Sequence, residues 1–147
     1  MHLHWKKVSI WSVVVWFCLI LSTSVNAEQK QTLGQWDVHY IAFPTIFLTP
    51  EIAKANGFIR SKYNAIINIS VLDKDTQVAQ RIEISGTARN LIGTTKDLKF
   101  KRVIDGDAIY YLAPLSFRHK ENYTFDIMIK QRNNSQKLTF KQEMFVD

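Results

Sequence analysis

The feature that most constrains the fold is an alternation of apolar and polar residues with a period of two, repeated from residue 36 to the end of the chain. Side chains at every second position of a strand share one face, so this pattern is typical of strands buried on one side. Seven short runs of this kind indicate an all-β fold. They fall at residues 36–41, 65–72, 78–89, 98–104, 108–115, 123–130 and 138–146.

The segments between these runs are rich in turn-forming residues. Residues 73–76, the pair Asp105-Gly106 and residues 132–135 combine aspartate, asparagine, glycine and serine, which tolerate positive φ or bond their own backbone. Asp105-Gly106, with strand patterns on both sides, is a strong hairpin signal. Connections this short imply antiparallel neighbours, because parallel strands need long crossovers.

One segment, residues 49–57, predicts a short helix instead. Thr49 is a suitable N-cap, Pro50 is preorganised for the first helical position, Glu51 suits the positive end and Gly57 suits the C-terminal cap. The chain is therefore expected to form an antiparallel, immunoglobulin-like sandwich of about seven to eight strands with one short helix. A small closed barrel is the alternative, since the disulfide of immunoglobulin domains is absent.

The first 27 residues have the organisation of a secretory signal peptide. Lys6 and Lys7 precede an apolar run of fourteen residues, 8–21, and small residues lead up to Ala27. This order predicts cleavage between Ala27 and Glu28, leaving residues 28–147 as a single β-sandwich domain. Because a helix needs roughly twenty residues to cross a bilayer, we expect no stable membrane span after cleavage.

Loss of this leader changes the composition of the chain. The only cysteine, Cys18, leaves with it, which excludes disulfides, thiol catalysis and cysteine metal sites in the exported protein. Removing Lys6 and Lys7 reduces the 19 basic residues to 17, which against 13 acidic residues gives a net charge of +4. This excess suits an anionic envelope surface or an acidic partner. No basic run interleaved with aromatics points to nucleic acid.

Few residues of the exported chain are suited to catalysis. A small hydrolase or metal-dependent enzyme would need His39 or His119 beside an aspartate or a nucleophile. The two histidines stand at unrelated positions, and a structural zinc site usually takes four ligands, so we expect surface histidines, no metal and no cofactor. The aspartate pairs within 73–75 and 105–107 are interpreted as turn formers, because calcium needs six to eight oxygens.

Aromatic and basic residues give the main sign of a recognition surface. Three phenylalanines bracket the predicted helix, and the adjacent Tyr110 and Tyr111 must point to opposite faces of a sheet. Aromatic side chains with a basic rim hold anionic or amphipathic ligands. The predicted binding residues are Phe43, Phe47, Arg60, Lys62, Tyr110, Arg118 and His119. The alternative is that the phenylalanines only plug one end of the sandwich.

Several motifs in order resemble one family of small exported γ-proteobacterial proteins, catalogued as domain of unknown function 4426. They are Tyr40-Ile41-Ala42-Phe43, residues 47–51, Arg60-Ser61-Lys62, residues 68–72, residues 86–88 with Asn90-Leu91, and residues 105–111. The resemblance covers nearly all of the exported chain. It implies a periplasmic, single-domain β protein, and it supplies no activity and no catalytic residues.

These observations favour a non-enzymatic binding or accessory module of the cell envelope. Its partners would be envelope proteins, or an anionic or amphipathic ligand, held at the end of the sandwich that contains Phe43 and Arg60. Two alternatives remain open at this point. One is the hydrolase or metal-dependent enzyme that uses a histidine, and the other is a carbohydrate or lipid binder. A single tryptophan outside the leader, Trp36, is a small number for such a binder.

Overall fold

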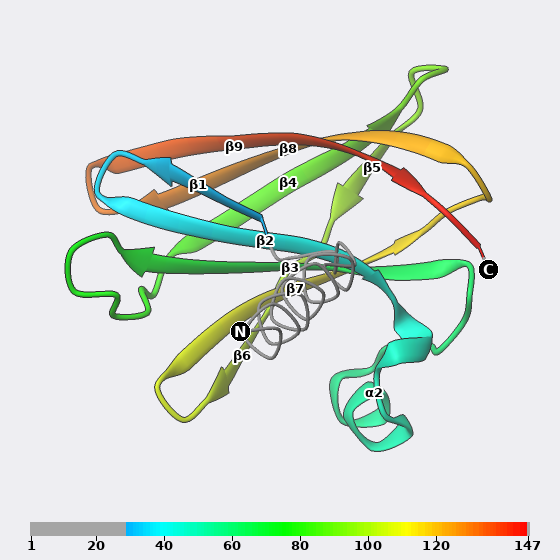
Figure 1. Ribbon diagram of the computed structural model, residues 1–147, viewed down its shortest axis with the longest axis horizontal. Helices are drawn as coiled ribbons and strands as arrows, with labels where there is room; N and C mark the ends of the chain where they lie inside the picture. The colour runs from blue at the N-terminus through cyan, green and yellow to red at the C-terminus, as the bar shows by residue number, and fades with distance from the viewer. Residues whose placement is uncertain (1–28, 147) are drawn as a thin grey trace, which may run out of the picture.

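The computed structural model describes residues 29–146 and consists of two antiparallel sheets packed face to face (Figure 1). The five-stranded sheet has the order β1-β2-β3-β7-β6, and the four-stranded sheet has the order β5-β4-β8-β9. The strands are β1 Gln29–Leu33, β2 Trp36–Pro44, β3 Asn64–Asp73, β4 Glu83–Asn90, β5 Thr95–Leu98, β6 Lys101–Asp105, β7 Ala108–Ser116, β8 Glu121–Gln131 and β9 Asn134–Met144. The predicted leader and its cleavage position lie outside the described residues, so cleavage stays a prediction.

The predicted all-β sandwich is confirmed. The strands form two separate sheets, so the alternative of a closed barrel is wrong. The described residues form nine strands rather than seven or eight, for two reasons. The first strand, β1, is too polar to show alternation, and the run 98–104 is divided between β5 and β6, which belong to different sheets. The connection at residues 99–100 therefore carries the chain from one sheet to the other.

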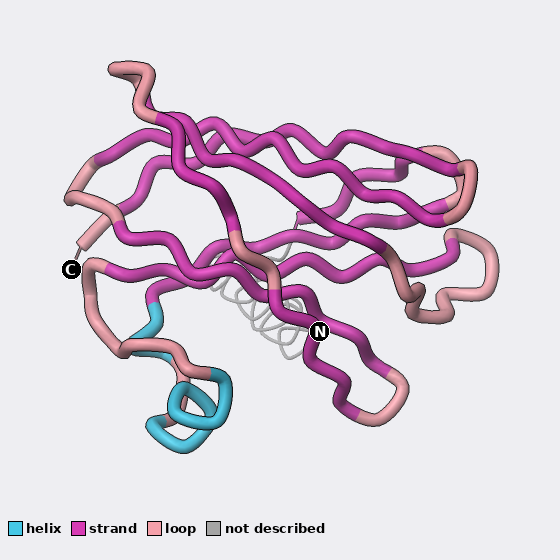
Figure 2. The backbone as a smooth tube through the Cα atoms, turned by 180° about the vertical axis from the view of Figure 1, so that it is seen from behind, coloured by secondary structure: helices cyan, strands magenta, loops and turns pink. Residues whose placement is uncertain are grey.

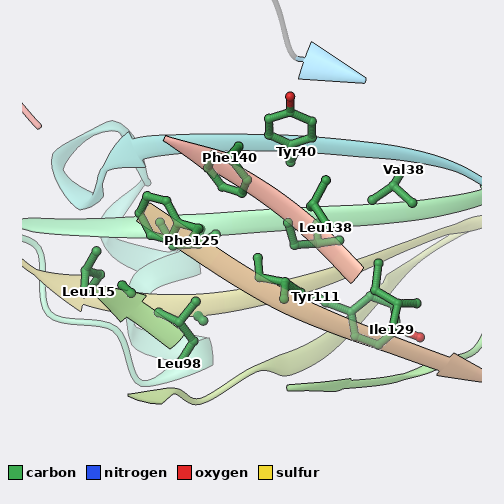
Figure 3. Packing of buried hydrophobic residues seen from close by; sticks show 14 of the residues in the cluster. Val38, Tyr40, Leu98, Tyr111, Leu115, Phe125, Ile129, Leu138 and Phe140 are labelled. Carbon is green, nitrogen blue, oxygen red and sulfur yellow. The ribbon is translucent and has the colours of Figure 1, made fainter. Parts of the chain in front are cut away.

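The core lies between the sheets and is built from the alternating positions (Figure 3). Tyr40 of β2 stacks on Phe140 of β9 with ring centroids 4.5 Å apart, and Phe140 stacks on Phe125 of β8 at 4.6 Å. These distances are favourable for aromatic pairs. Because Tyr40 comes from one sheet and the two phenylalanines from the other, this stack joins the two layers.

The adjacent tyrosines point to opposite faces of the five-stranded sheet. Tyr111 is buried in the core, where its hydroxyl accepts a hydrogen bond from the Ile82 N–H (2.9 Å) and lies 3.3 Å from the Gln80 carbonyl, to which it donates. Tyr110 is half-buried on the outer face. The core tyrosine thereby fixes the long connection between β3 and β4.

The helix forms where the sequence predicts it. Helix α2 spans Pro50–Asn56, the Thr49 hydroxyl accepts from the Ile52 N–H, and Gly57 closes the helix at φ 71°, a left-handed conformation that suits glycine. A short 3-10 helix, η1 at Thr45–Phe47, precedes it. Among residues 29–146, no helix is long and apolar enough to cross a membrane.

The sandwich has two ends with different connections (Figure 2). We call one the turn end, which carries the connections 34–35, 74–82, 106–107 and 132–133. The other, the loop end, carries the connections 45–63, 91–94 and 117–120 together with residues 145–146. Figure 1 shows the turn end mainly on the left and the loop end on the right, where the segment with α2 projects beyond the sheets.

Candidate functional site

Exposed apolar side chains gather at the loop end. Ten large hydrophobic residues are exposed within the described part of the chain, and only Val78 and Ile104 lie elsewhere. The eight at the loop end are Ile46, Phe47, Ile52, Ile59, Tyr63, Leu91, Ile92 and Phe145. Isolated apolar residues are normal on a protein surface. Their concentration at one end makes the loop end the candidate site.

Hydrogen bonds join three of the four segments of the loop end. The Phe117 N–H donates to the Tyr63 carbonyl over 2.9 Å, which links the connection 117–120 to the connection 45–63. The Val146 N–H donates to His119 Nδ1, also at 2.9 Å. A cavity of about 360 Å³ separates the connection 91–94 from the connection 117–120, and Ile92 and Arg118 both line it. The connections 45–63 and 117–120 and residues 145–146 are therefore joined, and the connection 91–94 lies across the cavity from them.

The connection 45–63, which we call the lobe, is held together by Thr45. This threonine is buried, its hydroxyl accepts from the Ser61 N–H at 2.8 Å, and its proton is shared between the carbonyls of Ile59 (2.9 Å) and Ser61 (3.0 Å). Buried polar groups need such partners, so one side chain closes the lobe on itself. Only Thr45, in η1, and Ala53, in α2, are buried in the two helices of the lobe.

Arg60 forms a second set of hydrogen bonds within the lobe. Its Nε donates to the Leu48 carbonyl at 2.9 Å and its Nη2 donates to the Ile46 carbonyl at 3.2 Å. A hydrogen bond from a charged donor is stronger than a neutral one. The backbone around Phe47 is thus fixed from two sides while the Phe47 ring stays in solvent.

Glu121 fixes the second half of the loop end. Its Oε1 accepts from the Tyr123 hydroxyl (2.7 Å) and the Arg118 N–H (3.1 Å), and its Oε2 accepts from Asn90 Nδ2 (3.1 Å). Burial raises the pKa of Glu121, but these hydrogen bonds and the nearby Lys96 ammonium outweigh burial and lower the pKa below its ordinary value. Burial and the Glu121 carboxylate together raise the pKa of Tyr123. Glu121 is therefore an ionised anchor between β4 and β8.

The loop end carries a positive charge. Its connections contain five cationic residues and one carboxylate, Glu51, which gives a net charge of +4. The cations are Lys54, Arg60, Lys62, Arg118 and Lys120. The ammonium of Lys62 lies 5.4 Å from the centroid of the Tyr63 ring, so charge and aromatic surface are adjacent.

A second concave region lies on the outer face of the five-stranded sheet. It is an open groove of about 370 Å³, lined by His39, Ser70, Leu72, Gln77, Ala79, Asp107, Ala108 and Tyr110. Two buried polar atoms on this face, His39 Nε2 and Asn68 Oδ1, have no hydrogen-bond partner among residues 29–146. No hydrogen bond between side chains of the described residues connects His39 to Ser70 or to Asp107, so these residue types do not form a nucleophile–base pair here.

The two histidines lie in different regions and have different surroundings. His39 lines the groove, whereas His119 belongs to the loop end, where it holds the segment after β9 and packs edge-on against Phe145 with ring centroids 6.2 Å apart. Within residues 29–146, no group of three histidine, aspartate or glutamate side chains is placed to hold a metal ion.

The loop end brings together most of the residues predicted as a binding surface. Phe47, Arg60, Lys62, Arg118 and His119 all belong to it. Phe43 lies half-buried on the outer face of β2, opposite Ile66, and Tyr110 lies in the groove. The exposed Phe47 does not act as a plug.

Of the eight exposed apolar residues of this surface, sequence reasoning named only Phe47. It missed the other seven, which are Ile46, Ile52, Ile59, Tyr63, Leu91, Ile92 and Phe145. The pair Leu91-Ile92 had a usable signal, since two large apolar residues occupy a four-residue turn between Asn90 and Thr95. Turns are normally polar, so an apolar pair in one indicates a contact outside the chain.

Solved structures with a similar fold include FetP of uropathogenic Escherichia coli strain F11, recombinantly expressed in the periplasm of E. coli. It is 12% identical, with a TM-score of 0.58 over 81% of this chain and 94% of that one. A copper-bound variant of FetP is 13% identical, with a TM-score of 0.57 over 80% and 95%. At this identity the likeness shows the fold alone. No curated protein matches the chain.

A closer likeness identifies the family. The crystal structure of a DUF4426 family protein from Pseudomonas aeruginosa PAO1 is 35% identical, with a TM-score of 0.74 over 83% of this chain and 98% of that one. The family model for a domain of unknown function, DUF4426, matches residues 30–147. The chain therefore belongs to the DUF4426 family, as the resemblance of its motifs predicted.

Proposed function

We propose that this protein is a non-enzymatic binding module of the cell envelope that docks on its partner through the loop end. One observation carries the proposal: eight of the ten exposed large hydrophobic side chains of the described residues lie at this end, among connections with a net charge of +4. Hydrophobic area supplies the attraction, and the charge selects an anionic partner.

A periplasmic location fits this role. The first 27 residues have the three parts of a secretory signal, and the chain without its leader has no cysteine that depends on the redox state of the compartment. FetP, which has a similar fold, was produced in the periplasm of E. coli. We place the processed protein, beginning at Glu28, in the periplasm.

The strand order supports an immunoglobulin-like relation. The orders β2-β3-β7-β6 and β5-β4-β8-β9 correspond to A-B-E-D and C′-C-F-G of immunoglobulin domains. Sandwiches of this kind carry their connections at two ends, and such loops on a rigid scaffold are where binding concentrates. The connection from A to B belongs to the loop end, and in this protein it is the long segment that we call the lobe.

Photocrosslinking in living cells tests the docking surface. A photoreactive amino acid replaces Phe47 or Ile92 at the loop end, or Val78 or Ile104 elsewhere, in the full precursor. All four positions are exposed, so each accepts the probe without disturbing the core. Discrete adducts, with a protein or with a lipid, are expected from Phe47 and Ile92 but not from the other two positions; equal adducts from all four, or none, would contradict the proposal.

A second candidate function is binding of a small polar ligand such as a sugar in the groove, which is lined by the polar side chains of His39, Ser70, Gln77 and Asp107. A few polar side chains that line a concave surface can orient such a ligand by hydrogen bonds. In a thermal-shift screen, such a ligand raises the melting temperature of the wild type but not of His39→Phe. A screen in which both proteins respond alike removes this candidate.

A further inference from the structure

The exposed apolar side chains of the loop end project separately rather than forming a packed patch. Leu91 and Ile92 are 83% and 88% exposed at the tip between β4 and β5, and Phe47 and Ile59 are 71% and 75% exposed on the lobe. Side chains this exposed make few contacts with their own neighbours. The surface therefore presents two apolar projections with cationic residues beside them.

A protein partner and a lipid surface differ in what they require of such a surface. Protein interfaces bury a central, closely packed core in a matching pocket. The boundary between lipid headgroups and acyl chains is fluid and accommodates separate apolar side chains, while Lys and Arg beside them contact anionic headgroups. Separate projections and a net charge of +4 match the second description.

The rigidity of the supporting backbone fits the same purpose. Thr45 and Arg60 fix the lobe, and Glu121 fixes the connection 117–120 beside the tip that carries Ile92. A preorganised backbone loses little conformational entropy when its side chains are inserted. The apolar groups are thus held out towards solvent without any change of fold.

We propose that the loop end binds the surface of an anionic phospholipid membrane. Leu91, Ile92, Phe47 and Ile59 enter the boundary between headgroups and acyl chains, and Lys54, Lys62, Arg118 and Lys120 contact the phosphate groups. This inference rests on the proposed function, because it takes the loop end as the docking surface and names its partner. The protein then sits on a membrane as a peripheral module with its turn end directed away.

Vesicle co-sedimentation tests the inference directly. The processed protein is recovered from cells that express the full precursor, and its mass confirms that the apolar leader is gone. It is mixed with vesicles of phosphatidylglycerol and phosphatidylethanolamine in equal parts, or of phosphatidylcholine alone. Binding to the first vesicles, at least about tenfold tighter than to the second and weakened by salt, is expected.

Matched variants assign the binding to the loop end. The double variant L91S/I92S should weaken binding about tenfold or more, because two apolar side chains no longer leave water. Its control is V78S/I104S, which removes two apolar side chains that are 58% and 50% exposed elsewhere. The pair R118E/K120E, compared with K74E/R132E at the turn end, tests the charge. Both controls should stay within about twofold of the wild type.

Two results overturn the inference. One is failure of the wild type to bind phosphatidylglycerol vesicles, and the other is an equal loss in the loop-end variants and their controls. If the vesicles fail while Phe47 and Ile92 still crosslink to an envelope protein in cells, the lipid partner is wrong and the docking surface stands. If both experiments fail, the proposed function falls with it.

Discussion

The two ends of this sandwich both reverse the direction of the strands, but they differ in how much apolar surface they expose. Both must satisfy the backbone where strands reverse. The turn end does so with polar side chains: Asp73 accepts from the N–H groups of Asp75 and Thr76, and Gln77 donates to Asp37 of β2. The loop end also satisfies its backbone internally, through Thr45, Arg60 and Glu121, but it leaves eight large apolar side chains in water.

Exposed apolar surface of this extent is not needed for folding. At the turn end, Val78 is the only large hydrophobic residue that is exposed within the described connections. The turn end thus shows that the fold closes a set of connections with a single exposed large hydrophobic side chain. Since both ends serve the same core, the apolar surface of the loop end is better explained by binding than by stability.

The largest expected effect on stability comes from comparing a phenylalanine of the core with a phenylalanine of the loop end. Phe125→Ala should lower the free energy of unfolding by about 3–5 kcal/mol, because Phe125 is fully buried and stacks on Phe140. Phe47→Ala should change it by less than about 0.5 kcal/mol, because the ring is exposed. Urea denaturation of both variants measures the difference. A large loss for Phe47→Ala would mean that the loop end is part of the core.

The next effect concerns the lobe. Thr45→Val removes the hydroxyl that binds Ile59 and Ser61. It leaves the half-buried Ser61 N–H without this partner and should cost about 1–3 kcal/mol of lobe stability. Hydrogen exchange of residues 45–63, relative to β8, measures it. Thr139→Val, which removes a hydroxyl that donates to Asp126 on an exposed strand position, is the control. Unchanged protection of the lobe would show that Thr45 does not preorganise it.

The strands and the helix were predictable because their signals are local. Alternation places side chains on one face of a strand, and Thr49, Pro50 and Gly57 cap a helix wherever it occurs. The change of sheet between β5 and β6 was not predictable, since nothing near residues 99–100 distinguishes it from continuation of one strand. Which sheet a strand joins depends on partners far away in the sequence.

The candidate site was predictable in part for the same reason. Phe47, Arg60 and Lys62 lie close together in the sequence, so composition alone indicated them. Leu91, Ile92 and Phe145 join them only because three antiparallel connections end on one side of the sandwich. Tyr110 was predicted to belong to the binding surface because it is aromatic. Its position on β7 places it in the groove instead of at the loop end.

A smaller effect is expected at the turn end from the core tyrosine. Tyr111→Phe keeps the ring in the core but removes the hydroxyl that accepts from the Ile82 N–H and donates to the Gln80 carbonyl. Loss of these hydrogen bonds should cost about 1–2 kcal/mol. The change should increase hydrogen exchange of residues 74–82 and leave the lobe unaffected. Equal loosening of both ends would contradict their independence.

The smallest expected effect is a shared response to acid. Hydrogen bonds from the N–H groups of Thr76 and Asp75 hold the pKa of Asp73 below its ordinary value. At the loop end, the pKa of Glu121 is also low, although burial opposes this. A carboxyl group with a lower pKa in the folded state stabilises the protein above its unfolded pKa, about 4 for these groups, and this stabilisation is lost as the pH falls through the folded pKa.

The contribution of these two carboxyl groups to the free energy of unfolding should therefore be constant between about pH 7 and pH 5. It should decrease below about pH 4. Glu121→Gln should flatten part of this decrease, and so should Asp73→Asn, whereas Glu143→Gln at an exposed position should not. Urea midpoints measured at each pH report the total, and the carboxyl resonances of Glu121 and Asp73 report each end. If only one variant changes the slope, the acid response belongs to that end, and the two ends differ in electrostatics as well as in apolar surface.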